Sequence, residues 1–208
     1  MAKIAEKCKL CRREGEKLYL KGERCFTTKC ANVKRNYAPG VHGPKSRVKL
    51  TDYGKQLRAK QAAKRLYGLS EKQFSNYVAK AIKKKENTAQ MIINFLESRL
   101  DNVIYRLGFT PSRGAARQFV GHGYVYVNNK KLNIPSYHAE PGDVITINPT
   151  KINKKLLNEV KERIKGKDAP EWIHLDKDVL AAKIIGAPQT AEGESVFDVQ
   201  SVIEFYSR

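Results

Sequence analysis

All four cysteines of this 208-residue chain lie within one short stretch, CKLCRREGEKLYLKGERCFTTKC, at residues 8–30. Cys8, Cys11, Cys25 and Cys30 are spaced C-x2-C-x13-C-x4-C. Four thiolates, two of them in a C-x2-C pair, form the ligand set of a tetrahedral structural zinc site, which leaves no open position for water. The pattern therefore predicts one structural Zn²⁺ bound by these four residues.

Spacing alone leaves three other states of the cysteines open. The thiols could be reduced and without a ligand, could form disulfides, or could bind an iron–sulfur cluster through the same four sulfur atoms. The beginning of the sequence, MAKIAEKCKLCRREGEK, lacks the apolar region of a secretory signal, so we expect a reducing cytoplasm, where disulfides rarely persist. Nothing around the cysteines indicates redox chemistry, and zinc is the favoured ligand.

The segment that carries the cysteines must be held in shape by something other than a hydrophobic core. Residues 1–45 show little apolar periodicity and include the turn-forming stretch NYAPGVHGPK. A metal that binds side chains distant in the sequence can replace such a core. We therefore predict that residues 1–45 form a basic, zinc-clipped arm.

The net charge of +19 is distributed unevenly along the chain. Residues 1–100 contain 25 Lys and Arg against 8 Asp and Glu, a charge of +17, whereas residues 101–208 contain 15 against 13, a charge of +2. Such a half-chain repels itself unless it meets a polyanion, and nucleic acid is the expected partner. No apolar run reaches the ~18 residues of a transmembrane helix, so a membrane span is not expected. An anionic membrane surface is the weaker alternative partner, because the basic helices lack a purely apolar opposite face.

Sequence signatures of catalysis are missing. GVHGPKS departs from the phosphate-loop spacing G-x4-G-K-[ST], and Pro44 removes a backbone donor from it. No serine lies in a G-x-S-x-G elbow. The four histidines are scattered, with no H-E-x-x-H motif: His42, His122, His138 and His174. We expect neither an enzyme nor a small-molecule substrate.

The remaining chain predicts helices first and strands later. Apolar spacing of about 3.6 residues begins after Thr51, and Ser70 with Gln73 predicts a capped second helix. From YVYVNNKKL onward the period changes to two, with a tight turn at Asn128–Asn129. NKKLLNEVKERIKG predicts a further helix, EWIHL and VLAAKII predict strands, and VQSVIEFYSR predicts a helix or a strand.

Residues 98–132 show the most specific pattern, that of two helices and a hairpin. Arg99 and Arg106 are seven residues apart, and Arg113 and Arg117 are four apart, so each pair is expected to share a helix face. A glycine-rich corner around His122 and a lysine-bearing hairpin tip follow. Guanidinium groups in this layout suit an RNA phosphate backbone. A merely solvated surface is the alternative.

This window resembles the RNA-binding domain named after ribosomal protein S4. The hallmark R-L-D-x-x-x-x-R-x-G…S-R-x-x-A-R-x-x-V…G-x-V-x-V-N is matched at Arg99-Leu100-Asp101, Arg106, Gly108, Ser112-Arg113, Ala116-Arg117, Val120, Gly123, Val125, Val127 and Asn128. NYAPGVHGPK, DYGKQLRAKQAAKRLYGLSEKQF and IEFYSR resemble flanking segments of the bacterial S4 family, and the cysteines resemble its zinc-type variant. The resemblance covers essentially the whole chain.

The resemblance implies an α+β fold with three parts. These are the zinc-clipped arm at 1–45, a helical domain at 46–96 joined by the C-terminal segment 197–208, and an inserted RNA-binding domain at 97–196 with an antiparallel sheet and a core module at 97–150. It also implies a structural protein of the cytoplasmic small ribosomal subunit that binds ribosomal RNA (rRNA) directly and nucleates assembly. The alternative is an accessory or regulatory RNA-binding protein that shares this domain.

The implied partners are small-subunit rRNA, neighbouring small-subunit proteins including S5, whose interface influences translational accuracy, and mRNA where it enters the subunit. We predict RNA contacts from basic and polar residues of all three parts: Arg12, Arg13, Lys34, Arg35, His42, Lys45, Arg47, Lys55, Arg58, Lys60, Arg65, Lys83, Lys84, Arg99, Arg106, Ser112, Arg113, Arg117, His122 and Lys130.

Overall fold

The computed structural model describes residues 4–45, 49–84, 87–148, 154–166, 168–188 and 197–207. The chain folds as two compact units. One contains the described residues up to Ile92 together with the C-terminal helix, and the other lies between Ile93 and Gln189. None of the described helices has the length and apolar character needed to cross a membrane.

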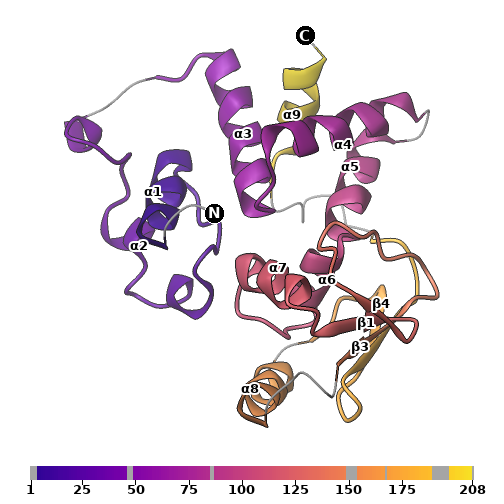
Figure 1. The fold of residues 1–208 in the computed structure, drawn as a ribbon. Helices are drawn as coiled ribbons and strands as arrows, with labels where there is room; N and C mark the ends of the chain where they lie inside the picture. Colours follow the sequence, from indigo (N-terminus) through magenta and orange to yellow (C-terminus); the bar gives the residue numbers. More distant parts are fainter. Residues whose placement is uncertain are drawn as a thin grey trace. The chain divides into compact units, whose positions relative to one another are not determined.

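The first unit is helical (Figure 1). It begins with α1 (Ile4–Glu14), the 3-10 turn η1 (Gly22–Cys25), the short helix α2 (Ala31–Lys34) and the 3-10 turn η2 (Gly43–Lys45). It continues with α3 (Asp52–Leu66), α4 (Glu71–Lys83) and the first part of α5 (Thr88–Glu97). The terminal helix α9 (Val199–Tyr206) packs against α3 and α4, so the C-terminal segment completes this unit.

Local capping chemistry explains where these helices begin and end. Thr51 Oγ1 accepts a hydrogen bond from the Gly54 backbone N–H at the start of α3. The predicted capping box of Ser70 and Gln73 is confirmed at the start of α4, where both reciprocal bonds form. Gly68, with φ of 64°, ends the preceding helix in the left-handed conformation that glycine adopts without steric cost.

The arm contains very little hydrophobic core. Among the described side chains up to Lys45, the buried apolar groups are Leu18 and the thiols of Cys11, Cys25 and Cys30. The α3–α4–α9 region, by contrast, buries Leu66, Phe74, Val202 and their neighbours. The expectation that residues 1–45 are poor in core is therefore confirmed for the part of the arm that the structure describes.

The second unit combines helices with an antiparallel sheet. Its elements are α6 (Leu100–Arg106), α7 (Arg113–Gly121), β1 (Val125–Val127), β2 (Lys130–Leu132), β3 (Val144–Ile147), α8 (Lys154–Lys165), β4 (Ile173–Asp176) and β5 (Ala181–Ile184). The described strands pair in the order β2-β1-β3-β5-β4, every neighbour antiparallel. The predicted mixture of helices and antiparallel sheet is confirmed.

Alternation along the strands places one face of the sheet against the helices. Val125, Ile145 and Ile184 are buried in a shared core with residues of α6, α7 and α8. The predicted tight turn at Asn128 and Asn129 is confirmed, since both residues have positive φ, at 49° and 62°. This compact support holds α6 and α7, which carry Arg106, Arg113 and Arg117.

Candidate metal centre and nucleic-acid interface

The four cysteines surround one small cavity in the arm. Cys8 and Cys11 lie on α1, Cys25 ends η1 and Cys30 immediately precedes α2. All four are free thiols and line a space of about 10 Å³, which is on the scale of a single water molecule or ion. Chain segments distant in sequence therefore bring the predicted ligands together.

The electrostatics of this cavity disfavour four uncompensated thiolates. Burial raises the pKa of Cys11, a hydrogen bond to the Leu18 backbone opposes this, and negative charge on the other three thiols would raise it further. Burial likewise raises the pKa of Cys25, whose Sγ accepts a 3.4 Å hydrogen bond from the Lys21 backbone N–H. A bound cation would reverse both effects, so the donor set fits a metal such as Zn²⁺.

Among the residues that the structure describes, however, no group of three or more His, Cys, Asp or Glu side chains is arranged so that it could hold a metal ion. The cysteines thus share a cavity without forming a finished coordination shell. Zinc binding stays a prediction at this point.

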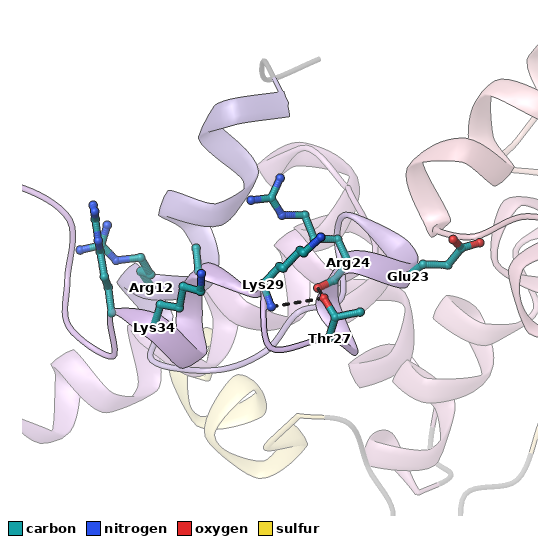
Figure 2. A pocket seen from close by; sticks show the side chains of 8 residues that line it. Arg12, Glu23, Arg24, Thr27, Lys29 and Lys34 are labelled. Atoms are coloured by element: carbon teal, nitrogen blue, oxygen red, sulfur yellow. Dashed lines mark hydrogen bonds between the residues drawn. The ribbon is translucent and has the colours of Figure 1, made fainter.

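The arm also contains a larger, basic pocket (Figure 2), whose lining shares Ala31 with that of the cysteine cavity. Its volume is about 720 Å³, and among the described residues five cationic side chains and a single carboxylate line it. Thr27 organises one wall, because its Oγ1 donates to the Arg24 carbonyl at 3.1 Å and accepts from the Lys29 backbone N–H at 3.3 Å. The lining residues are Arg12, Glu23, Arg24, Thr27, Lys29, Ala31, Lys34 and Arg35.

Three of the predicted RNA-binding residues line this pocket, namely Arg12, Lys34 and Arg35. Arg24 and Lys29 line it as well and were missed. A sequence signal for them existed, because each directly precedes a predicted metal ligand, and a metal clip fixes the direction of the neighbouring residues.

The other predicted residues of the arm are placed as follows. Arg13, His42 and Lys45 are exposed, so their RNA contacts stay predictions. Arg47 lies outside the described residues. On the helical unit, Lys55 is exposed and forms a 2.9 Å ion pair with Asp52 of its own helix.

Arg58 and Arg65 have a partner within the protein. Both guanidinium groups pair with Oε1 of Glu14, whose side chain is buried between α1 and α3. Burial raises the pKa of Glu14, and the two arginines oppose that rise. These two predicted RNA ligands therefore attach the arm to α3, and only their remaining exposed surface is open to a partner. Lys83 and Lys84, at the end of α4, are exposed.

Lys60 is a correction to the predicted contacts. It is only 5% exposed, its Nζ donates to Glu71 Oε1 at 2.7 Å, and it lies 4.6 Å from the centre of the Phe205 ring of α9. The cation is committed to the junction of α3, α4 and α9, so the prediction that it contacts RNA is wrong. Sequence periodicity could not reveal that a C-terminal helix covers this position.

Glu71 is the counter-ion of that junction. Burial raises the pKa of Glu71, but hydrogen bonds from Lys60, Lys64 and the hydroxyl of Tyr206 outweigh the burial and lower the pKa to about 2. Burial raises the pKa of Tyr206, and the hydrogen bond to the charged Glu71 carboxylate raises it further. The ionised carboxylate therefore helps to hold α9 on α3 and α4.

Arg99 is a second correction. It lies one residue before α6, is 1% exposed, and pairs with the carboxylate of Asp101 through Nε at 3.1 Å and Nη2 at 2.8 Å. The prediction that Arg99 and Arg106 present a shared helix face to RNA is therefore wrong. A desolvated guanidinium needs an internal carboxylate, and Asp101 supplies it.

Glu97 organises the remaining arginines of the module. Its carboxylate accepts two hydrogen bonds from Arg106, at 2.7 and 2.8 Å, and one from Asn102 Nδ2 at 2.7 Å. Arg113 donates to Asn102 Oδ1 at 2.7 Å and stacks 4.6 Å from the centre of the Tyr105 ring. The arginine side chains are thus fixed by α5 and α6, and a change of Arg113 to alanine would disturb the fold rather than only a surface.

The other predicted residues of the module keep some access to solvent, apart from Ser112. Ser112 is buried and caps α7, where its Oγ accepts from the Ala115 backbone N–H at 3.3 Å. Arg117 is half-buried, whereas His122 and Lys130 are exposed near the corner and the hairpin tip. For these exposed groups, contact with RNA stays a prediction.

The helix–helix–hairpin module, the basic pocket and the core-poor arm together define a nucleic-acid-binding class of protein. Comparison with protein families identifies the class more closely. Residues 3–97 match the ribosomal protein S4/S9 N-terminal domain, and residues 98–145 match the S4 domain.

Curated relatives extend this match over nearly the whole chain. Small ribosomal subunit protein uS4 of Kosmotoga olearia is 52% identical over 201 residues, which cover 97% of this chain and 96% of the relative. The uS4 proteins of Thermotoga maritima and Thermus thermophilus are 50% and 46% identical, over 97% and 99% of this chain and 96% and 98% of the relatives. The chain belongs to the uS4 family of small-subunit ribosomal proteins, which confirms the predicted family and the expectation that it is not an enzyme.

Proposed function

We propose that this protein is a structural, rRNA-binding component of the small ribosomal subunit. The observation that carries the proposal is its identity of about half to uS4 proteins along nearly the full length of both chains. The distribution of charge supports it, because residues 1–100 carry +17 and require a polyanion as partner. The small subunit in the cytoplasm is accordingly the proposed location.

The basic arm is the proposed principal rRNA-binding surface of the protein. Arg24, Lys29, Lys34 and Arg35 are exposed around one pocket and form no ion pair with any residue that the structure describes. Cations that have no internal partner keep their full attraction for phosphate. Arg106 of α6 and Arg113 of α7, which have internal partners, instead keep the module rigid, so that its rim reaches the RNA through Arg117, His122 and Lys130.

A structural zinc ion is part of the proposal. Cys8, Cys11, Cys25 and Cys30 would hold it, and it would supply the cross-link that the arm lacks as hydrophobic core. The shared cavity and the unfavourable burial of uncompensated thiolates support this role. The pocket cations would then be positioned by the metal clip.

Further details follow from the family resemblance and are proposed with the same function. Direct binding to rRNA early in assembly would nucleate the subunit. Contact with the neighbouring protein S5 would influence translational accuracy, and the protein would lie near the point where mRNA enters.

Co-sedimentation tests the proposal. Tagged protein expressed in a bacterial cell should sediment with small ribosomal subunits in a sucrose gradient, and should stay with them through a wash at moderate salt. The matched control is a chain in which Lys29, Lys34 and Arg35 are changed to glutamine, and it should be partly released by the same wash. A wild-type chain that sediments only with free RNA or with an enzyme complex would favour the accessory or regulatory role.

A further inference from the structure

The arm carries an exposed aromatic ring, Phe26, next in the chain to residues that line the basic pocket. Phe26 is 71% exposed, yet its ring stacks on that of Tyr19, with centroids 4.9 Å apart and planes 28° from parallel. In the chain, Phe26 stands between Arg24 and Thr27, both of which line the pocket. One face of the phenyl ring is thus supported by an aromatic partner, and most of its surface is open to solvent.

The backbone under this pair is itself unusual. Tyr19 has φ of 49°, in the left-handed region that bulky side chains rarely adopt. Such a conformation persists only where the surrounding structure enforces it, and it is often found at binding sites. Here the strained backbone carries the Tyr19 ring that stacks on Phe26. Phe26 faces solvent and is not part of a hydrophobic core.

The pocket has the size and charge for more than a single phosphate. Its volume of about 720 Å³ lies within the range of ~300–1,000 Å³ that is usual for sites of drug-sized ligands. Arg24, Lys29, Lys34 and Arg35 supply four exposed positive charges, and Glu23 is the single carboxylate among the described lining residues. A nucleotide with its flanking phosphates matches both the space and the charge.

Three of the pocket cations directly neighbour cysteines in the chain. Arg12 directly follows Cys11, and Arg24 and Lys29 directly precede Cys25 and Cys30. Arg12 is further anchored, because its Nε donates to the Tyr37 carbonyl at 3.0 Å and its guanidinium lies 4.7 Å from the centre of the Tyr37 ring. Arg12 is thus anchored by contacts within the arm, and the proposed metal on the cysteines would hold the backbone beside Arg24 and Lys29.

We propose that this part of the arm binds one unpaired nucleotide of RNA. The base stacks on the open face of Phe26, and the phosphates beside it pair with the cations of the pocket. The proposal rests on the proposed function and deepens it, since it names the RNA feature that the arm recognises. A continuous duplex could use the cations, but it would leave Phe26 in water, because its bases are already stacked on one another.

Two RNA duplexes of the same sequence, one with a single unpaired uridine in one strand, test the proposal with the full-length chain. Wild-type protein should bind the bulged duplex more tightly. Phe26→Leu should lose about 5- to 150-fold of that preference, the fold-change that corresponds to stacking one base on an aromatic ring. Its affinity for the plain duplex should be unchanged.

Three control variants separate stacking from fold and from charge. Tyr53→Leu removes an exposed aromatic ring of α3 that packs near Phe205, and it should leave the preference unchanged. Lys34→Gln should weaken binding to both duplexes and reduce the slope of log affinity against log salt by about 1, without changing the preference. Lys17→Gln, an exposed lysine of the arm outside the pocket lining, should change that slope less.

Photocrosslinking of wild-type protein tests the contact between Phe26 and the unpaired base even if Phe26→Leu misfolds. With 4-thiouridine at the unpaired position, the crosslink should map to the tryptic peptide Cys25–Lys29. Equal wild-type affinity for the two duplexes, or a crosslink elsewhere in the chain, would overturn the inference while binding to small-subunit rRNA remained. A wild-type chain that fails to bind small-subunit rRNA would overturn the proposed function itself.

Discussion

The change Glu97→Gln should destabilise the second unit more than any change of an exposed ion pair. Glu97 is 5% exposed and accepts both hydrogen bonds of the Arg106 fork. Glutamine keeps the shape but removes the charge, and its amide turns a donor toward the guanidinium. Breaking a buried pair costs about 3–5 kcal/mol, and the Arg106 side chain is still 32% exposed. We therefore expect a loss of about 3 kcal/mol in the free energy of unfolding.

Urea unfolding followed by tryptophan fluorescence reports the unfolding of the second unit, to which Glu97 belongs. Trp172 is the single tryptophan of the sequence and packs against the core that supports α6 and α7. The matched control is Glu159→Gln, which removes a partly exposed pair with Arg163 at 3.2 Å on α8 and should cost about 0.5 kcal/mol or less. Equal losses for the two variants would refute the view that Glu97 organises a desolvated network.

Two further predictions concern the first unit. Purified protein should contain about one zinc ion per chain, and Cys11→Ser should lose it and make the arm sensitive to protease; a metal-free chain with a protease-resistant arm would contradict the clip. The folded pKa of Glu71, about 2, is lower than its ordinary value of 4.5, so its contribution to stability is present above about pH 4.5 and is lost as the pH falls toward 2. The free energy of unfolding should therefore fall less steeply across this window in Glu71→Gln than in the wild type, and equal slopes would show that Glu71 does not hold α9.

Local chemistry made parts of the fold predictable from the sequence. The capping box at Ser70 and Gln73 and the turn at Asn128 and Asn129 depend on residues within a few positions of each other, and the structure contains both. The family was predictable for a similar reason, because its hallmark residues lie within one continuous window. The core-poor arm followed from the lack of apolar periodicity.

The fate of individual cations was not predictable in this way. Whether Arg99 or Lys60 reaches solvent depends on Asp101 in one case and on the distant helix α9 in the other. In the sequence, a cation that becomes buried and one that stays exposed can have the same charge and the same helical spacing. Only the tertiary packing, which supplies the counter-ion, distinguishes them. Arg24 and Lys29 line a pocket built from segments joined only in three dimensions, so their position directly before a predicted metal ligand was the one signal for them in the sequence.

A filter-binding titration over a salt series tests the central claim most directly. The full-length chain would be titrated with small-subunit rRNA and with an unrelated RNA duplex at each salt concentration. A +17 half-chain that neutralises about 6–10 phosphates should lose roughly a thousandfold or more in rRNA affinity between about 50 and 200 mM salt. Its preference for the rRNA over the duplex should survive, because contacts to shape and to unpaired bases release no counter-ions. If the preference disappears together with the affinity, the chain acts as a non-specific polycation, and the account of a structural rRNA-binding protein is contradicted.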